Sequence, residues 1–280
     1  MSAPRTPPVF STPVDLRPDL TPQPAITHVV FDFDGTLSWV RHGWPDMMRN
    51  VFRRVWIPLP GEDDACREEL LDSIVLGLNG RPTLVQMLHF VELLRHRGGA
   101  CEAEALRVEY QGELDTAIAR RLAAIRSGQV PRDAYVVHRG RAFLEYLAQT
   151  DLHLIVLSST IEHRVREEAA ALGLSHYFKN RIHGSGENPA GFSKLEVLRE
   201  ILRADGIRGE NLLSFGDGPV ELECTKQLGG TAVAICSDER ENGSGVMDPV
   251  KRAQLLAAGA DIALPDFRDA TILVEYLCGR

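Results

Sequence analysis

The chain has 280 residues, 44% hydrophobic and 25% charged, and this composition excludes an intrinsically disordered or fibrous protein. Its formal net charge of −8 and its pI near 5.6 argue against general affinity for nucleic acid or anionic membranes, which need clustered positive charge. No run of about 18 consecutive apolar residues occurs, so the sequence predicts no membrane span. These properties favour a small molecule as the partner and leave the oligomeric state open.

The cysteines are scattered along the chain and form no C-x-x-C pair. Such an odd, unclustered set is typical of a reducing compartment. The N-terminus also lacks the apolar segment of a secretory signal. We therefore expect a cytoplasmic location. The five cysteines are Cys66, Cys101, Cys224, Cys236 and Cys278.

Residues 1–25 hold seven prolines among Ser, Thr and Arg, without a sustained apolar period. A segment of this composition buries too little apolar surface to offset the entropy lost on ordering. We expect a flexible Pro-rich extension, and an arm docked on the protein is the alternative.

Short apolar runs recur from residue 26 onward and alternate with helical patterns in the second half of the chain. This alternation predicts an α/β fold, with a Rossmann-like three-layer core around a mainly parallel sheet. The expected strands are 29–33, 152–157, 211–215, 231–235 and 261–264, and the expected helices between them include 161–172 and 193–204.

The interval 42–131 contains successive helical patterns and no convincing strand. An all-helical block inserted directly after the first strand predicts a second, smaller domain. The core would then consist of residues 26–41 and 132–280. The helices expected in the insert are 45–56, 65–76, 82–97 and 102–126.

The first strand runs into two carboxylates, Asp32 and Asp34, followed by Gly35. In an extended chain, residues two apart lie on the same side, with Cα atoms about 6 to 7 Å apart. Two like charges about 4 Å apart repel by about 4 kcal/mol at an effective dielectric near 20. A cation or a proton must therefore belong to the arrangement, unless the pair merely caps the following turn.

Three further segments place reactive groups at strand ends or helix starts. The strand 152–157 is followed by Ser158, Ser159 and Thr160, whose hydroxyl and N–H donors suit an anion, although Ser and Thr are also ordinary N-cap residues. Lys194 heads the helix 193–204 and could equally be a solvated surface charge. Asp217 and Glu221 follow the strand 211–215 in "GDGPVELE", which could also be a structural turn.

The order of these segments, D-x-D-G-T, then strand-Ser, then Lys, then G-D-x-x-x-E, resembles the haloacid dehalogenase (HAD) superfamily from about residue 26 to the end. The segment 257–269 is similar to the superfamily's terminal strand and loop. The resemblance implies a Mg²⁺-dependent phosphatase that hydrolyses a small phosphorylated metabolite, such as a sugar phosphate, through an aspartyl-phosphate intermediate. The helical insert at 42–131 would be its cap.

The resemblance also implies roles for single residues. Asp32 would be the nucleophile and Asp34 the general acid and base. Ser158, Ser159 and Lys194 would bind the phosphate. Mg²⁺ would bind the Asp32 carboxylate, the Asp34 backbone carbonyl and Asp217, with Glu221 reaching the metal directly or through water. Glu221 departs from the superfamily's pattern, which often has an aspartate there.

The segment 76–88 in the insert resembles the substrate-facing cap loop of the phosphoglycolate phosphatase and β-phosphoglucomutase relatives. Arg81 is therefore the candidate specificity residue, and a solvated arginine beside a helix start is the alternative.

Competing functions share most of these features. A phosphomutase of the β-phosphoglucomutase type would use every motif residue, and a non-catalytic binding protein could retain the fold. A dehalogenase does not need Asp34 as an acid, and a phosphonatase needs a cap lysine, which the insert lacks. We therefore expect neither dehalogenase nor phosphonatase activity.

Overall fold

The computed structural model describes residues 6–78, 82–186 and 191–279. The chain divides into two compact units, Met1–Val40 with Ala124–Arg280, and Arg41–Ala123. The expected insert spanned 42–131, whereas the second unit ends inside the helix α4 (Ala103–Arg126). None of the helices in the described residues is long and apolar enough to cross a lipid bilayer.

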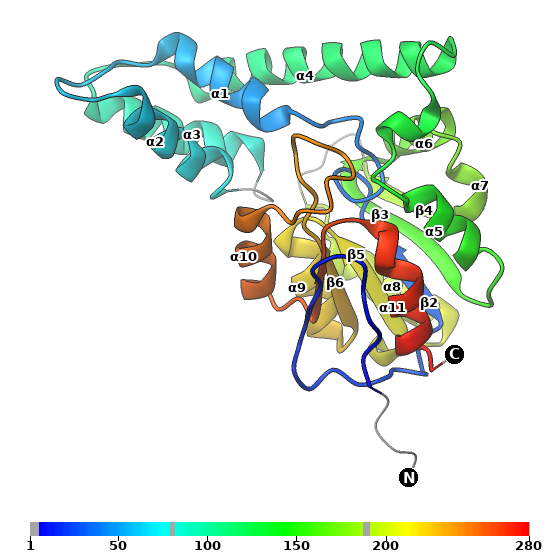
Figure 1. Ribbon diagram of the computed structural model, residues 1–280. Helices are drawn as coiled ribbons and strands as arrows, with labels where there is room; N and C mark the ends of the chain where they lie inside the picture. The colour runs from blue at the N-terminus through cyan, green and yellow to red at the C-terminus, as the bar shows by residue number, and fades with distance from the viewer. Residues whose placement is uncertain (1–5, 79–81, 187–190, 280) are drawn as a thin grey trace. The chain divides into compact units, whose positions relative to one another are not determined.

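The first unit is built on a sheet (Figure 1). Within the described residues its strand order is β1-β7-β6-β5-β2-β3-β4. Every neighbouring pair is parallel except β1 with β7. The prediction of an α/β fold with a mainly parallel sheet is confirmed. The strands are β1 (Asp15–Leu16), β2 (His28–Phe31), β3 (His153–Ile161), β4 (Ile182–Ser185), β5 (Leu212–Gly216), β6 (Thr231–Ile235) and β7 (Ile262–Leu264).

Helices cover both faces of this sheet, because alternate residues of its buried strands point to opposite sides. Val30 faces a cluster that includes Leu198 of α8 and Cys224 of α9. On the other face, Phe31 packs against Phe143 of α5, with ring centroids 6.1 Å apart. The helices of this unit are α5 (Gly140–Leu147), α6 (Glu162–Ala171), α7 (Ser175–Phe178), α8 (Lys194–Asp205), α9 (Pro219–Leu228), α10 (Pro249–Ala257) and α11 (Ala270–Leu277), with short 3-10 helices η1 (Arg132–Tyr135), η2 (Gly209–Asn211) and η3 (Phe267–Asp269).

The N-terminal arm differs from the expected flexible extension in its described part. Residues Asp15–Leu16 add an antiparallel strand to β7. The backbone N–H and hydroxyl groups of Ser11 and Thr12 donate four hydrogen bonds of 2.7 to 3.0 Å to the Asp269 carboxylate. A buried carboxylate and an unpaired strand edge therefore supply the binding energy that the arm's own composition lacks.

The regular elements in the described residues of the second unit are helices, and they pack around their own apolar core. Phe52 and Phe90 stack with ring centroids 4.0 Å apart. At one end, Arg97 lies 4.0 Å from the Trp56 ring and forms a 2.7 Å ion pair with Glu62. Its helices are α1 (Trp44–Val55), α2 (Asp64–Val75), α3 (Thr83–His96) and α4 up to Ala123.

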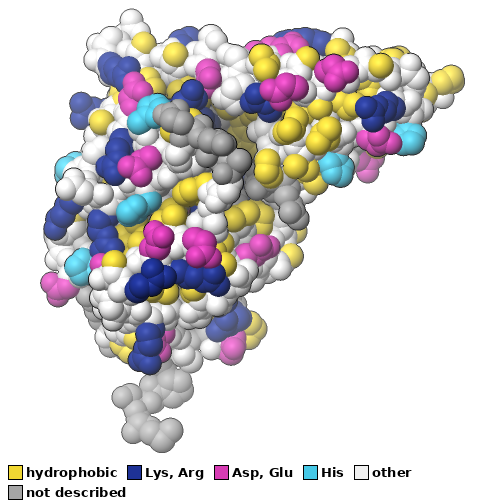
Figure 2. Space-filling view, turned by 180° about the vertical axis from the view of Figure 1, so that it is seen from behind, with side chains coloured by type: hydrophobic (Ala, Val, Ile, Leu, Met, Phe, Trp, Pro, Cys, Tyr) yellow, Lys and Arg dark blue, Asp and Glu magenta, His cyan; other side chains and the backbone are white. Residues whose placement is uncertain are grey.

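The molecular surface in Figure 2 shows acidic and basic side chains interspersed over the face that is drawn. Charges of both signs in alternation do not form the single-sign positive field that attracts a polyanion.

Candidate active site

The reactive segments meet at the carboxyl edge of the sheet, around the end of β2. The order of the strands reverses there, with β3 on one side of β2 and β5 on the other. Such a switch point is where open α/β sheets bind ligands. Asp32 follows β2 directly, and its N–H donates to the Phe215 carbonyl at 2.9 Å, which extends the ladder and holds the residue at the edge.

Lys194 lies against the Asp32 carboxylate. It is the first residue of α8, whose N-cap Ser193 accepts a hydrogen bond from the Glu196 N–H. Its Nζ is 2.9 Å from Asp32 Oδ1 and 3.2 Å from Glu221 Oε2, and its side chain is 4% exposed. The alternative of a solvated surface lysine is therefore wrong.

Burial is the main reason that the pKa of Asp32 lies well above its usual range, and Lys194 opposes this shift. Glu221 and Asp217 add to the shift by repulsion. Burial alone would lower the pKa of Lys194, but Asp32 and Glu221 outweigh it and raise this pKa, so the lysine stays charged. The site therefore carries more negative charge than Lys194 neutralises.

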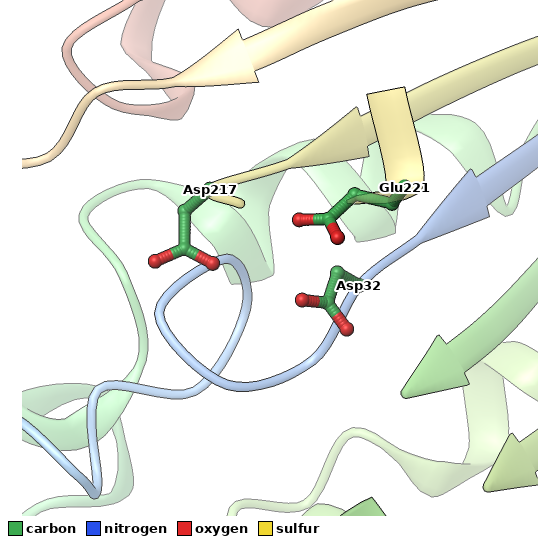
Figure 3. A group of neighbouring side chains, drawn as sticks. All are labelled: Asp32, Asp217 and Glu221. Atoms are coloured by element: carbon green, nitrogen blue, oxygen red, sulfur yellow. The ribbon is translucent and has the colours of Figure 1, made fainter. Parts of the chain in front are cut away.

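Asp217 and Glu221 face Asp32 from the end of β5 and the start of α9 (Figure 3). Ligand oxygens of the three carboxylates lie within 4.8 Å of one another. Close backbone approach makes this possible, because a Cβ on Gly35 would lie 2.0 Å from Asp217 Oδ2. Burial raises the pKa of Asp217 to about 6, which Lys251 opposes and Glu221 and Glu239 reinforce.

This donor set fits a magnesium ion. Mg²⁺ prefers carboxylate and carbonyl oxygens, and three carboxylates at this spacing supply them. Burial is the main cause of the raised pKa values of Asp32 and Asp217, and repulsion from Glu221 adds to both, so a cation bound among these carboxylates would relieve that repulsion. Glu221 already accepts from the Gly218 N–H at 2.6 Å and from Lys194, so each of its oxygens has a protein donor.

Asp34 meets the end of β3 instead of the carboxylate cluster. Thr160 Oγ1 donates to Asp34 Oδ2 at 2.7 Å, and Ser158 Oγ lies 3.5 Å from the same oxygen. Ser158 is buried, whereas Ser159 is exposed. Alternation along the strand turns the Ser159 side chain away from Asp34, so the structure does not bring that hydroxyl to the site.

One site residue had no part in the sequence predictions, and another has a contact that they did not include. Thr160, expected with Ser158 and Ser159 as a donor to an anion, donates to Asp34. Lys251 of α10 contacts Asp217, with Nζ 3.2 Å from Oδ2, and also pairs with Glu239. The scarcity of lysine in the sequence was a usable signal, because only Lys179, Lys194, Lys226 and Lys251 occur. Arg81, the expected specificity residue, lies outside the described residues.

Comparison with known proteins agrees with this geometry. Residues 29–225 match the model of the haloacid dehalogenase-like hydrolase family. No curated protein matches the chain.

Several solved structures are similar in fold, at low sequence identity. One is described as a "predicted phosphoglycolate phosphatase" from Haemophilus somnus 129pt (14% identity, 89% of this chain and 98% of that chain, TM-score 0.59). Another is a HAD family hydrolase from Deinococcus radiodurans R1 with bound phosphate and sodium (14% identity, 91% and 98%, TM-score 0.60). A third is a haloacid dehalogenase-like protein of unknown function from Agrobacterium tumefaciens str. C58 (13% identity, 89% and 97%, TM-score 0.61).

The family match spans more than half of the sequence and includes the segments that supply Asp32, Asp34, Lys194, Asp217 and Glu221. The chain therefore belongs to the haloacid dehalogenase-like hydrolase family.

Proposed function

We propose that the protein is a Mg²⁺-dependent phosphatase that hydrolyses a small phosphorylated metabolite through an aspartyl-phosphate intermediate. The observation that carries this proposal is the Asp32–Lys194 ion pair beside the carboxylates of Asp217 and Glu221. A solved structure of similar fold contains bound phosphate, and another is described as a "predicted phosphoglycolate phosphatase", which supports the substrate class.

In the first step, a carboxylate oxygen of Asp32 attacks phosphorus, and the bond from phosphorus to the leaving oxygen breaks. Asp34 gives its proton to that oxygen, so the product leaves as an alcohol. In the second step, Asp34 takes a proton from water, which attacks the aspartyl phosphate and releases inorganic phosphate. Asp32 is regenerated as a carboxylate and Asp34 as an acid.

The other residues position the reacting groups and neutralise their charge. Positioning and electrostatic stabilisation supply most of the catalysis in phosphoryl transfer. Lys194 would bind a non-bridging phosphoryl oxygen while remaining beside Asp32. Glu221 would orient Lys194, because its Oε2 accepts from the ammonium at 3.2 Å. Ser158 lies beside Asp34, and its hydroxyl would also bind the phosphoryl group there.

The Asp32 carboxylate, the Asp34 backbone carbonyl and Asp217 would hold Mg²⁺. When bound, the ion would neutralise the charge on the phosphoryl oxygens and the repulsion among the carboxylates.

The test is release of inorganic phosphate from a panel of small phosphomonoesters in the presence of Mg²⁺. We expect turnover by the natural protein and by Asp19→Asn, whose side chain is 76% exposed, and a loss of about 10³-fold or more in Asp32→Asn. Equal activity in Asp32→Asn would exclude Asp32 as the nucleophile. Isomerisation of a sugar phosphate without net phosphate release would show a mutase instead.

A second measurement does not depend on finding the substrate. BeF₃⁻ with Mg²⁺ mimics a phosphorylated aspartate, and we expect the pair to raise the melting temperature of the natural protein. Asp32→Asn should lose this shift. If Mg²⁺ and BeF₃⁻ leave the melting temperature of the natural protein unchanged, a non-catalytic binding protein becomes the better interpretation.

A further inference from the structure

Lys251 places a second buried ammonium at the carboxylate site. Its side chain is 7% exposed, and it lies between Asp217, at 3.2 Å, and Glu239. These two partners are 15% and 16% exposed. Lys194 pairs with Asp32 and Glu221, whereas Lys251 pairs with Asp217 and Glu239, so each lysine contacts two of these four carboxylates.

The local structure of α10 gives no reason for a lysine at this position. Asp248 caps the helix by accepting from the N–H groups of Val250 and Lys251, and Pro249 begins it. A cation in the first turn of a helix opposes the helix dipole, and burial further disfavours its charge. The contacts that compensate for this placement are those with Asp217 and Glu239.

Because Glu239 offsets the charge of Lys251, this lysine does not reduce the net negative charge that could bind a divalent cation. The three clustered carboxylates and Lys194 have a formal charge of −2, and Lys251 with Glu239 adds nothing to it. Lys251 and a metal ion would nevertheless compete for the same carboxylate of Asp217. Glu239 gives the ammonium a second anion to which it can move.

We propose that Lys251 competes with Mg²⁺ for the Asp217 carboxylate and so weakens the binding of the ion, and that Glu239 limits this effect by sharing the ammonium. This inference rests on the proposed function, because it concerns the same metal site.

The contacts of Asp217 that remain without Lys251 determine the direction of the effect. Thr36 Oγ1 lies 3.3 Å from Asp217 Oδ1, and the carboxylate lies against the Gly35 backbone. Asp217 therefore keeps its position in Lys251→Met while losing a competing positive charge. In Glu239→Gln the ammonium loses its second anion, so Asp217 is the one negatively charged partner left of the two.

The experiment is a titration with MgCl₂ that follows the thermal unfolding midpoint, together with Mn²⁺ binding measured by electron paramagnetic resonance. We expect the cation to bind about tenfold more tightly to Lys251→Met and about tenfold more weakly to Glu239→Gln than to the natural protein. Lys251→Arg, which retains the charge, should restore the natural affinity.

Lys226→Met is the matched control. Lys226 pairs at 2.7 Å with the buried carboxylate of Asp261, away from the site, so its removal should leave cation affinity unchanged. If Lys251 had only a structural role, Lys251→Met and Lys226→Met would both be less stable. The cation affinities of Lys251→Met and Glu239→Gln would then not change in opposite directions.

Natural affinity in both Lys251→Met and Glu239→Gln, or weaker binding in both, would overturn the inference while leaving the proposed function intact. Failure of the natural protein to bind Mg²⁺ or Mn²⁺ would overturn both. If Lys251→Met does not fold, Glu239→Gln decides the question by its affinity alone.

Discussion

Replacing Asp217 by asparagine should stabilise the metal-free protein. The pKa of this carboxyl is raised from 3.8 to about 6, chiefly by burial, so its ionised form is disfavoured in the folded state. A shift of about two units, at about 1.4 kcal/mol per unit, corresponds to about 3 kcal/mol. Its side chain is 15% exposed, so solvent screens this penalty only slightly. Asp217→Asn removes the charge and retains an oxygen that can accept from Lys251.

The sign of the pH dependence follows from proton linkage. A group whose pKa is raised on folding binds its proton more tightly in the native state, so stability falls as the pH rises toward the folded pKa. The penalty is complete above a pH of about 6 and disappears as the pH approaches 4. The free energy of unfolding of Asp217→Asn should therefore exceed that of the natural protein by about 3 kcal/mol at pH 7.5 and by little at pH 4.

Urea unfolding in EDTA at several pH values measures this difference. Asp269→Asn is the control with opposite sign, because hydrogen bonds from Ser11 and Thr12 outweigh burial and lower the pKa of Asp269. That variant should be less stable than the natural protein at pH 7.5. The reasoning is refuted if Asp217→Asn is no more stable than the natural protein at pH 7.5, or if the difference does not change with pH.

Three further changes test other parts of the site and the core. Gly35→Ala would place a Cβ 2.0 Å from Asp217 Oδ2 at a φ of 74°, so we expect at least about tenfold slower phosphate release and about 1 to 2 kcal/mol lower stability in urea; unaltered kinetics would contradict the close approach. Thr160→Val removes the 2.7 Å hydrogen bond to Asp34 and should lower kcat about tenfold, whereas Thr160→Ser should retain activity. Burial lowers the pKa of His28, so the natural protein should lose stability relative to His28→Gln as the pH falls from about 7 to 5 in urea unfolding; parallel profiles would show that His28 does not titrate.

The strands that the sequence predicted are those with continuous apolar runs. β2, β3, β5, β6 and β7 lie within a few residues of their expected positions, since strands buried on both faces need apolar residues throughout. β4 was not predicted, because His183 and Gly184 interrupt its apolar pattern. β1 has only two residues and exists through its pairing with β7, which no local pattern encodes.

The site divides in the same way between local and tertiary information. Asp32, Asp217 and Glu221 could be found from the sequence because they follow apolar runs at fixed offsets, and parallel strands bring such offsets to one edge. Lys251 and Glu239 lie on a helix and a loop whose approach to Asp217 depends on packing over many residues. The arm illustrates the same limit, since its order depends on Asp269, more than 250 residues away.

The carboxylates at the two ends of β2 have pKa values shifted in opposite directions. The pKa is lowered at the amino end, and it is raised at the carboxyl end, where the candidate active site lies. At the amino end, His28 lies 3.1 Å from Asp205, the last residue of α8, and Arg181 also pairs with that carboxylate. Although burial opposes it, the Arg181 guanidinium, with a smaller contribution from His28, lowers the pKa of Asp205, so this carboxylate stabilises the fold.

At the carboxyl end, Asp32 meets Lys194, the first residue of the same helix, and there burial raises the carboxyl pKa. Two polar contacts thus fix α8 alongside β2, and the one at the amino end holds the register in which Lys194 reaches Asp32. The stabilising pair lets the fold tolerate an unfavourable concentration of negative charge at the other end. That charge would be useful to a protein that binds a cation and a phosphoryl group there.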